Sequence, residues 1–126
     1  MTVDLSTVEA VLHAYFDGLH DGDAAKLKAI FHADAHLFNV SSKGAIVVTS
    51  RDAFADGVAS RPSAKSQGLA REDWIESLER SGPETACATV RCQIPPRYFT
   101  DYLTLAKGPT GWQIVSKTYH TDLRAA

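Results

Sequence analysis

The second half of the chain alternates between apolar and polar residues, and short turn signals interrupt this alternation at three places. The turn signals are Ser81-Gly82-Pro83, Pro95-Pro96 and the stretch from Gly108 to Gly111. Period-2 alternation is typical of strands that bury one face, and connections this short join antiparallel neighbours. The pattern predicts an antiparallel meander with strands at about 72–80, 85–94, 97–107 and 112–121.

The first half shows helical spacing instead. Ser6-Thr7-Val8-Glu9 is a capping-box pattern at the start of a helix over residues 7 to about 20. Asp23 can cap a second helix that ends near His32, and Ser50 can cap a short third helix that carries Phe54 and Val58.

A hairpin is expected between the second and third helices. The residues from Ala35 to Val40 and from Ile46 to Thr49 alternate, with a polar turn between them. The stretch from Arg61 to Gly68 is loop-like and could cover a cavity mouth. Helices followed by strands indicate an α+β domain, with three N-terminal helices packed on one face of a curved, mostly antiparallel sheet. We expect one domain over residues 1–126.

Composition removes several classes of function. Charged residues make up 22% and hydrophobic residues 44% of the chain, as in ordinary globular proteins. The net charge is -2 and the basic residues are scattered, so nucleic acid is not an expected partner. The sequence shows no apolar run long enough for a membrane span and no secretory leader, so we expect a cytoplasmic protein without membrane contact. Cys87 and Cys92 fall on opposite faces of one predicted strand and cannot pair, which fits a reducing compartment.

Strand parity places a carboxylate on a face that is otherwise apolar. In the strand from Phe99 to Leu105, Asp101 shares its face with Leu103, and in the preceding strand Val90 and Cys92 belong to the interior face. A buried carboxyl group is costly unless it is paired, hydrogen-bonded or neutral. Asp101 is therefore a polar anchor inside a pocket, or it has a purely structural place. In the second case it is hydrogen-bonded to nearby Ser, Thr or backbone groups, or it lies at an exposed bend of the strand.

Parity in the last strand predicts which side chains line a wetter part of the interior. One face turns from apolar to polar toward its end and is predicted to face inward; it holds Trp112, Ile114, Ser116, Thr118 and His120. The opposite face would suit a homodimer contact through the sheet together with Tyr102, although an ordinary solvated face fits equally well; it holds Gln113, Val115, Lys117, Tyr119 and Thr121.

The stretch FHADAHLFNV at residues 31–40 brings His32, Asp34 and His36 close together in sequence. Two histidines four residues apart bind a metal when both lie on one helix face, but here a helix-to-strand change falls between them. The histidines are therefore expected to diverge at the surface. We predict no metal site and no cofactor.

Two stretches carry a resemblance to a known family. YFDGLHDGDAAKLKAIFHADAHLFNV at residues 15–40 resembles the opening of the nuclear transport factor 2-like superfamily, and FTDYLTLAKGPTGWQIVSKTYH at residues 99–120 resembles the ending of its lumazine-binding-like subgroup. The resemblance implies a cone-shaped, cystatin-like α+β roll that encloses an apolar cavity, and a homodimer formed through the sheet.

Ketosteroid isomerase is similar over the same segments. The resemblance puts its oxyanion-binding tyrosine on Tyr15, its neutral carboxylic acid on Asp101 and its general-base aspartate on Asn39. An asparagine cannot accept and return a proton, so this resemblance does not carry over that isomerase reaction.

Three functions remain open. The first is a small-molecule-binding protein, with the ligand held by Tyr15, Asn39, Val90, Cys92, Asp101, Leu103, Ser116, Thr118 and His120. The second is an isomerase, dehydratase or cyclase in which Tyr15 and Asp101 stabilise an oxyanion and His120 replaces the missing base. The third is a dimeric interaction module without chemistry, whose interior is filled by Phe31, Trp74 and Trp112.

Overall fold

The computed structural model describes residues 3–124. In chain order, the elements are α1 (Val8–Asp21), α2 (Ala24–Ile30), β1 (Phe31–Val40), β2 (Ile46–Ser50), α3 (Arg51–Ala59), β3 (Trp74–Ser81), β4 (Thr85–Ile94), β5 (Arg97–Gly108) and β6 (Gly111–Leu123). The predicted α+β class, with three helices followed by a meander, is confirmed.

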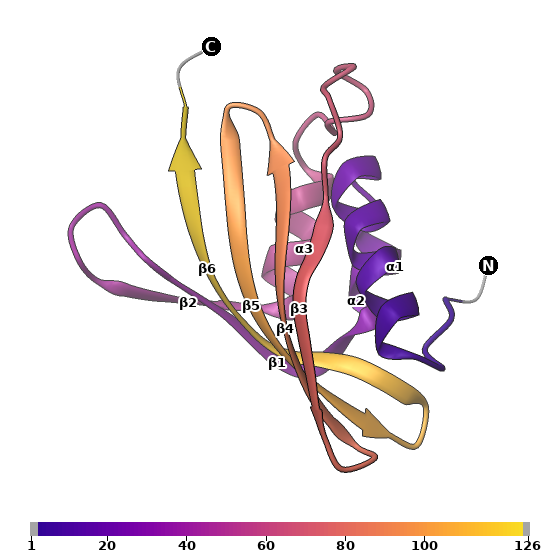
Figure 1. Cartoon of the computed structure of the whole chain (residues 1–126). Coiled ribbons are helices and arrows are strands. Elements are labelled where there is room, and N and C mark those ends of the chain that lie inside the picture. The colour runs from indigo at the N-terminus through magenta and orange to yellow at the C-terminus, as the bar shows by residue number, and fades with distance from the viewer. Residues whose placement is uncertain (1–2, 125–126) are drawn as a thin grey trace.

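The six strands form one sheet in the order β2-β1-β6-β5-β4-β3. Neighbours are antiparallel except β1 and β6, which pair in parallel. Figure 1 shows the three helices together on one face of the curved sheet, while the β1–β2 hairpin reaches away from them. We call the helix-covered face the inner face and the other the outer face.

Short polar side chains start all three helices, as helix N-caps do. Thr7, Asp23 and Ser50 accept hydrogen bonds from backbone N–H groups three residues further on, at 3.0, 3.1 and 3.1 Å. Ser6 is not the cap, because its hydroxyl donates to Asp4 instead. The second helix ends at Ile30 rather than near His32, since the backbone is already extended at the next residue, where β1 begins.

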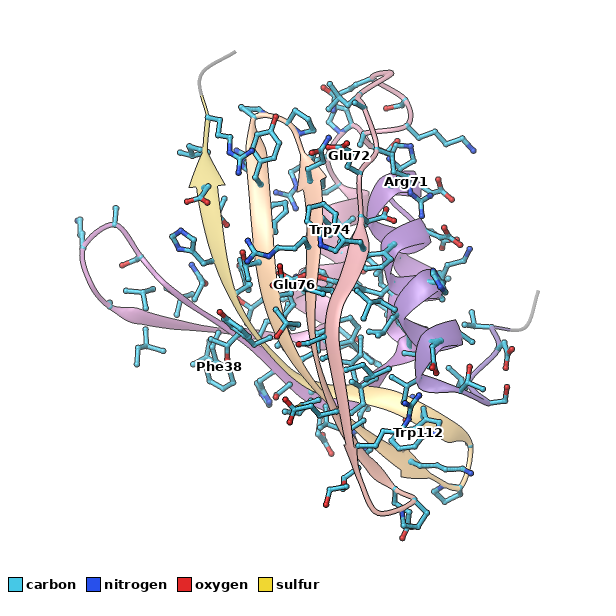
Figure 2. All side chains as sticks on the ribbon, in the orientation of Figure 1. Phe38, Arg71, Glu72, Trp74, Glu76 and Trp112 are labelled. Atoms are coloured by element: carbon cyan, nitrogen blue, oxygen red, sulfur yellow. The ribbon has the colours of Figure 1, made fainter. Side chains whose placement is uncertain are left out.

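The inner faces of β4 and β5 contribute much of the hydrophobic core. The predicted interior face of these strands is confirmed: Val90, Leu103 and Asp101 are all 1% exposed or less. Trp112 is buried beside the start of α1, where its backbone N–H donates to Leu5. Trp74 does not fill the interior, because it is 52% exposed on the outer face opposite Arg91, and Figure 2 shows it lying across the strands.

A β-bulge in β6 reverses the predicted faces of its second half. Leu105 pairs with Ile114, but the preceding Thr104 pairs with Ser116, so Val115 is an extra residue in β6. One extra residue turns every later side chain to the other face. Lys117 is consequently buried, at 4% exposure.

The parity prediction is therefore wrong beyond the bulge. Ser116, Thr118 and His120 lie on the outer face, where the hydroxyl groups of Thr104 and Ser116 are 2.5 Å apart. Tyr119 and Thr121 follow Lys117 on the inner face and are half-buried.

The tight turn between β5 and β6 gives a test of how the N-terminal segment docks. Gly111 has φ +118, and a Cβ there would come 2.5 Å from the backbone oxygen of Leu5. We expect Gly111→Ala to lower the free energy of unfolding by roughly 1–3 kcal/mol in urea denaturation. Gly108→Ala is the matched control, since a Cβ there meets nothing within 4 Å. Equal stability of the two variants would contradict this account of the turn.

Candidate ligand-binding cavity

Three polar side chains from three different elements meet inside the molecule. The Tyr15 hydroxyl, on α1, donates to Asp101 Oδ2 at 2.5 Å, and Lys117 Nζ donates to the same hydroxyl at 2.6 Å. Asp101 and Lys117 come from the paired strands β5 and β6. We call Tyr15, Asp101 and Lys117 the buried triad.

The buried triad holds an ion pair almost without solvent. Lys117 Nζ lies 3.7 Å from Asp101 Oδ2, and the two side chains are 5% and 0% exposed. The ammonium also lies over three aromatic rings, with 5.2, 4.7 and 4.6 Å to the centroids of Tyr15, Phe54 and Tyr119. Aromatic faces attract a cation, most strongly when it is desolvated. They therefore offset part of the desolvation cost of this lysine.

The direction of the hydrogen bonds identifies Asp101 as an acceptor. An ammonium can only donate, so the Tyr15 hydroxyl must accept from Lys117 and direct its own proton at Asp101. Cys92 Sγ also lies 3.8 Å from Asp101 Oδ2. The expected oxyanion site, in which Tyr15 and Asp101 both donate to a ligand, does not match this arrangement.

Burial keeps the Tyr15 hydroxyl and the Cys92 thiol protonated. Burial, and next the negative charge of Asp101, raise the pKa of Tyr15 well above its ordinary value. The same two causes, in the same order, raise the pKa of the Cys92 thiol. Both groups are protonated at neutral pH, so they act as hydrogen-bond donors rather than as nucleophiles.

A cavity of about 220 Å³ opens beside the buried triad, between α1, α3 and the inner face of β4–β6. Its walls are mostly apolar, with Tyr15, Cys92 and Lys117 among the polar groups. The lining residues are Tyr15, Leu19, Phe54, Val58, Arg61, Cys92, Ile94, Arg97, Phe99, Lys117, Tyr119 and Thr121. Arg61 belongs to the loop that was expected to cover a cavity mouth.

The structure places the other predicted site residues in different surroundings. Asp101 lies directly behind Tyr15 and Cys92, whereas Val90 and Leu103 belong to the packed core. Asn39 is half-buried on β1 opposite Val47 and does not line this cavity.

The base proposed for an enzyme is also misplaced. His120 is 70% exposed, and its Nε2 lies 2.9 Å from Asp122 Oδ1 on the outer face. It cannot reach a substrate bound beside Tyr15. Ser116 and Thr118 share that outer face and do not line the cavity.

Sequence reasoning missed Lys117, Tyr119 and Thr121 because it assumed unbroken alternation in the last strand. A signal for the bulge was present, since Ile114 and Val115 are adjacent apolar residues. Tyr119 likewise falls out of phase with Trp112 and Ile114. An apolar pair followed by a change of phase indicates a bulge.

The histidine-rich stretch lies at the surface. His32, Asp34 and His36 are exposed, and His32 Nδ1 accepts a hydrogen bond from the backbone N–H of Asp34 at 3.0 Å. Within residues 3–124, no group of three or more His, Cys, Asp or Glu side chains is arranged to hold a metal ion. No helix in the same range is long and apolar enough to cross a membrane.

The family comparison agrees with this fold. Residues 3–120 match the model of the family described as "Putative lumazine-binding". The chain belongs to this family. Among curated proteins, no sequence matches significantly.

Several solved structures have folds similar to that of this chain. An NTF-2 like protein of unknown function from Silicibacter pomeroyi DSS-3 is 26% identical, with a TM-score of 0.80 and coverage of 91% of this chain and 92% of that one. A ketosteroid isomerase-like protein from Erwinia carotovora atroseptica SCRI1043 is 17% identical, with a TM-score of 0.70 and coverage of 98% and 100%. A domain from Nostoc punctiforme PCC 73102 with a cystatin-like fold is 19% identical, with a TM-score of 0.70 and coverage of 98% and 80%. The predicted superfamily is thereby confirmed.

The buried triad predicts strong energetic coupling between its two charges. Asp101→Leu and Lys117→Met should each lower the free energy of unfolding by roughly 3–5 kcal/mol, because each leaves the other charge buried and unpaired. The double variant should lose far less than the sum, as measured by urea denaturation in a double-mutant cycle.

An exposed pair provides the control for this cycle. Arg80 and Glu9 lie 2.8 Å apart with side chains about half exposed, so Arg80→Met and Glu9→Leu should couple by less than about 1 kcal/mol. Additive losses at Asp101 and Lys117 would show that the two charges do not stabilise one another.

Proposed function

We propose that the chain is a small-molecule-binding protein whose ligand occupies the cavity beside the buried triad. The observation that carries the proposal is the contrast between apolar walls and a polar floor at Tyr15, Cys92 and Lys117. Pockets that bind small molecules are mostly apolar with a few placed polar groups. The volume, about 220 Å³, is below the usual range for drug-sized ligands, so the ligand should be small.

This proposal is preferred to the two alternatives on specific grounds. The enzyme alternative relied on His120 as a base, and that side chain lies outside the cavity. The alternative of a filled interior relied partly on Trp74, which is half exposed, whereas the cavity keeps its open volume. The cytoplasmic location expected from the sequence stays a prediction.

The family description supplies a first compound to try. Lumazine is a flat heteroaromatic molecule with carbonyl groups, and such an edge can accept a hydrogen bond from the Lys117 ammonium. We include it as one probe among small heteroaromatic and carbonyl compounds.

A cavity-filling variant tests whether binding occurs at this place. Thr121→Trp should place a large ring in the cavity and abolish the thermal shifts that library compounds cause in the unchanged protein. Thr110→Trp adds the same ring in the exposed turn between β5 and β6, outside the cavity, and should leave those shifts intact. If no compound shifts the melting temperature, or if both variants bind equally well, the cavity is not the binding site.

We also propose that two copies associate through the outer face of the sheet. Trp74 and Tyr102 are 52% and 56% exposed on this face, and exposed aromatic residues are enriched at protein interfaces. An aromatic surface of this kind is costly to leave in water.

Charge substitution on the outer face tests the homodimer. Tyr102→Glu should convert a dimer into a monomer in sedimentation equilibrium, because it buries a carboxylate in the interface. Lys65→Glu, on an exposed loop on the helix side, should leave the dimer intact. A monomeric unchanged protein, or a Tyr102→Glu dimer, would contradict the proposal.

A further inference from the structure

The cavity is lined by three cationic side chains and by no carboxylate. Lys117, Arg61 and Arg97 contribute to its lining, whereas Asp101 lies behind the wall. Within residues 3–124, neither of these two arginines forms an ion pair. By contrast, the arginines Arg71, Arg80 and Arg91 each lie within 3.2 Å of a carboxylate.

The cations lie at two different depths. Lys117 and Tyr15 are buried and form the floor, whereas Arg61 and Arg97 are exposed and stand at the mouth. A second hollow of about 260 Å³ under residues 61–67 adjoins the cavity and shares both arginines. Between floor and mouth, the walls include Leu19, Phe54, Val58, Ile94 and Phe99.

The positive charge at the floor of the cavity has a carboxylate partner, whereas the two positive charges at its mouth have none in the described part of the chain. Asp101, 3.7 Å away, offsets the charge of Lys117, whereas the two arginines have no such partner. The field of Arg61 reaches the cavity wall. Burial and the charge of Asp101 raise the pKa of Tyr119, and the positive charge of Arg61 opposes that rise. A negative group would therefore be attracted to the mouth.

The floor still offers a donor. An ammonium carries three N–H groups; one donates to the Tyr15 hydroxyl, and Asp101 Oδ2, at 3.7 Å, neutralises the charge without a hydrogen bond. An N–H that is not used by Tyr15 can donate to an acceptor oxygen in the cavity, since Lys117 lines it. A ligand that satisfies both ends must thus carry an anion at one end and an oxygen acceptor at the other.

We propose that the ligand is a small organic carboxylate with an apolar body and a carbonyl or hydroxyl oxygen at its far end. The carboxylate lies between Arg61 and Arg97, the body lies against the apolar walls, and the far oxygen accepts from Lys117. This inference rests on the proposed binding function and narrows its ligand class. Guanidinium groups suit this role, because they hydrogen-bond carboxylates with matching geometry.

A set of isosteric probes tests the inference by isothermal titration calorimetry on the full chain. The probes are para-acetylbenzoate, its neutral amide para-acetylbenzamide, and para-ethylbenzoate, which lacks the far oxygen. Para-acetylbenzoate should bind tightest, and the amide should bind roughly tenfold more weakly or worse because it loses a charge-assisted hydrogen bond. Para-ethylbenzoate should also bind more weakly than para-acetylbenzoate, since the Lys117 N–H then lacks its acceptor.

Variants that each remove one positive charge distinguish direct binding by Arg61 and Arg97 from an effect of the protein's overall charge. Arg61→Gln and Arg97→Gln should each weaken binding of para-acetylbenzoate roughly tenfold and leave binding of the amide unchanged. Arg124→Gln is the control, because Arg124 stacks on Tyr98, 4.1 Å from the ring centroid, and does not line the cavity.

The outcomes separate failure of this inference from failure of the binding function. The carboxylate assignment is overturned if the amide binds as tightly as the carboxylate, if Arg61→Gln or Arg97→Gln has no effect, or if no carboxylate binds. Binding of neutral compounds that Thr121→Trp abolishes would then leave the cavity as a binding site for another ligand class. If neutral compounds do not bind either, the proposed binding function is contradicted together with the carboxylate assignment.

Discussion

The ion pair between Lys117 and Asp101 is the interaction on which the interior of this protein depends. Two charges removed from water are costly unless their geometry is good and further hydrogen bonds complete it. Here the Tyr15 hydroxyl connects the two charges, and Cys92 and three aromatic rings lie around them. Asp101 Oδ1 is buried without a hydrogen-bond partner among the described residues. Because Tyr15 belongs to α1, its connection between the two charges forms only when that helix is correctly seated on the sheet.

The same interaction separates this protein chemically from the oxyanion site that its sequence suggests. An oxyanion site needs donors directed at the ligand, whereas here the Tyr15 proton is directed at Asp101. In the binding mode that we propose, the donor to the ligand is Lys117 on β6. Tyr15 and Asp101 contact this lysine.

Much of the fold followed from local rules. Caps at Asp23 and Ser50, strand parity in β4 and β5, and the burial of Asp101 could all be predicted, because each depends on a few neighbouring residues. The end of the second helix could not, since the extended backbone at Phe31 reflects its pairing with β6.

The candidate site was predictable only in part. Tyr15 and Cys92 were found, but the bulge at Val115 exchanged Lys117 for His120 on the inner face. A bulge depends on how two strands pair, which a rule for one strand does not contain. Arg61 comes from a loop, where no periodicity indicates direction, whereas Arg97 shares the parity of Phe99 and Asp101 and could have been placed on the inner face. Sequence spacing also could not show that Asn39 lies away from the cavity.

The strand order has a consequence for how the chain acquires this interior. β6, the last of the six strands, lies between β1 and β5, so the β1–β2 hairpin joins the meander only through β6. During synthesis, Tyr15 and Asp101 emerge before Lys117, and neither half of the sheet can be completed until the last strand inserts. The last strand supplies both the centre of the sheet and the counter-charge for its buried carboxylate. A nascent chain that stalls before β6 would therefore expose its strand edges and leave Asp101 without its partner, a species suited to recognition by chaperones.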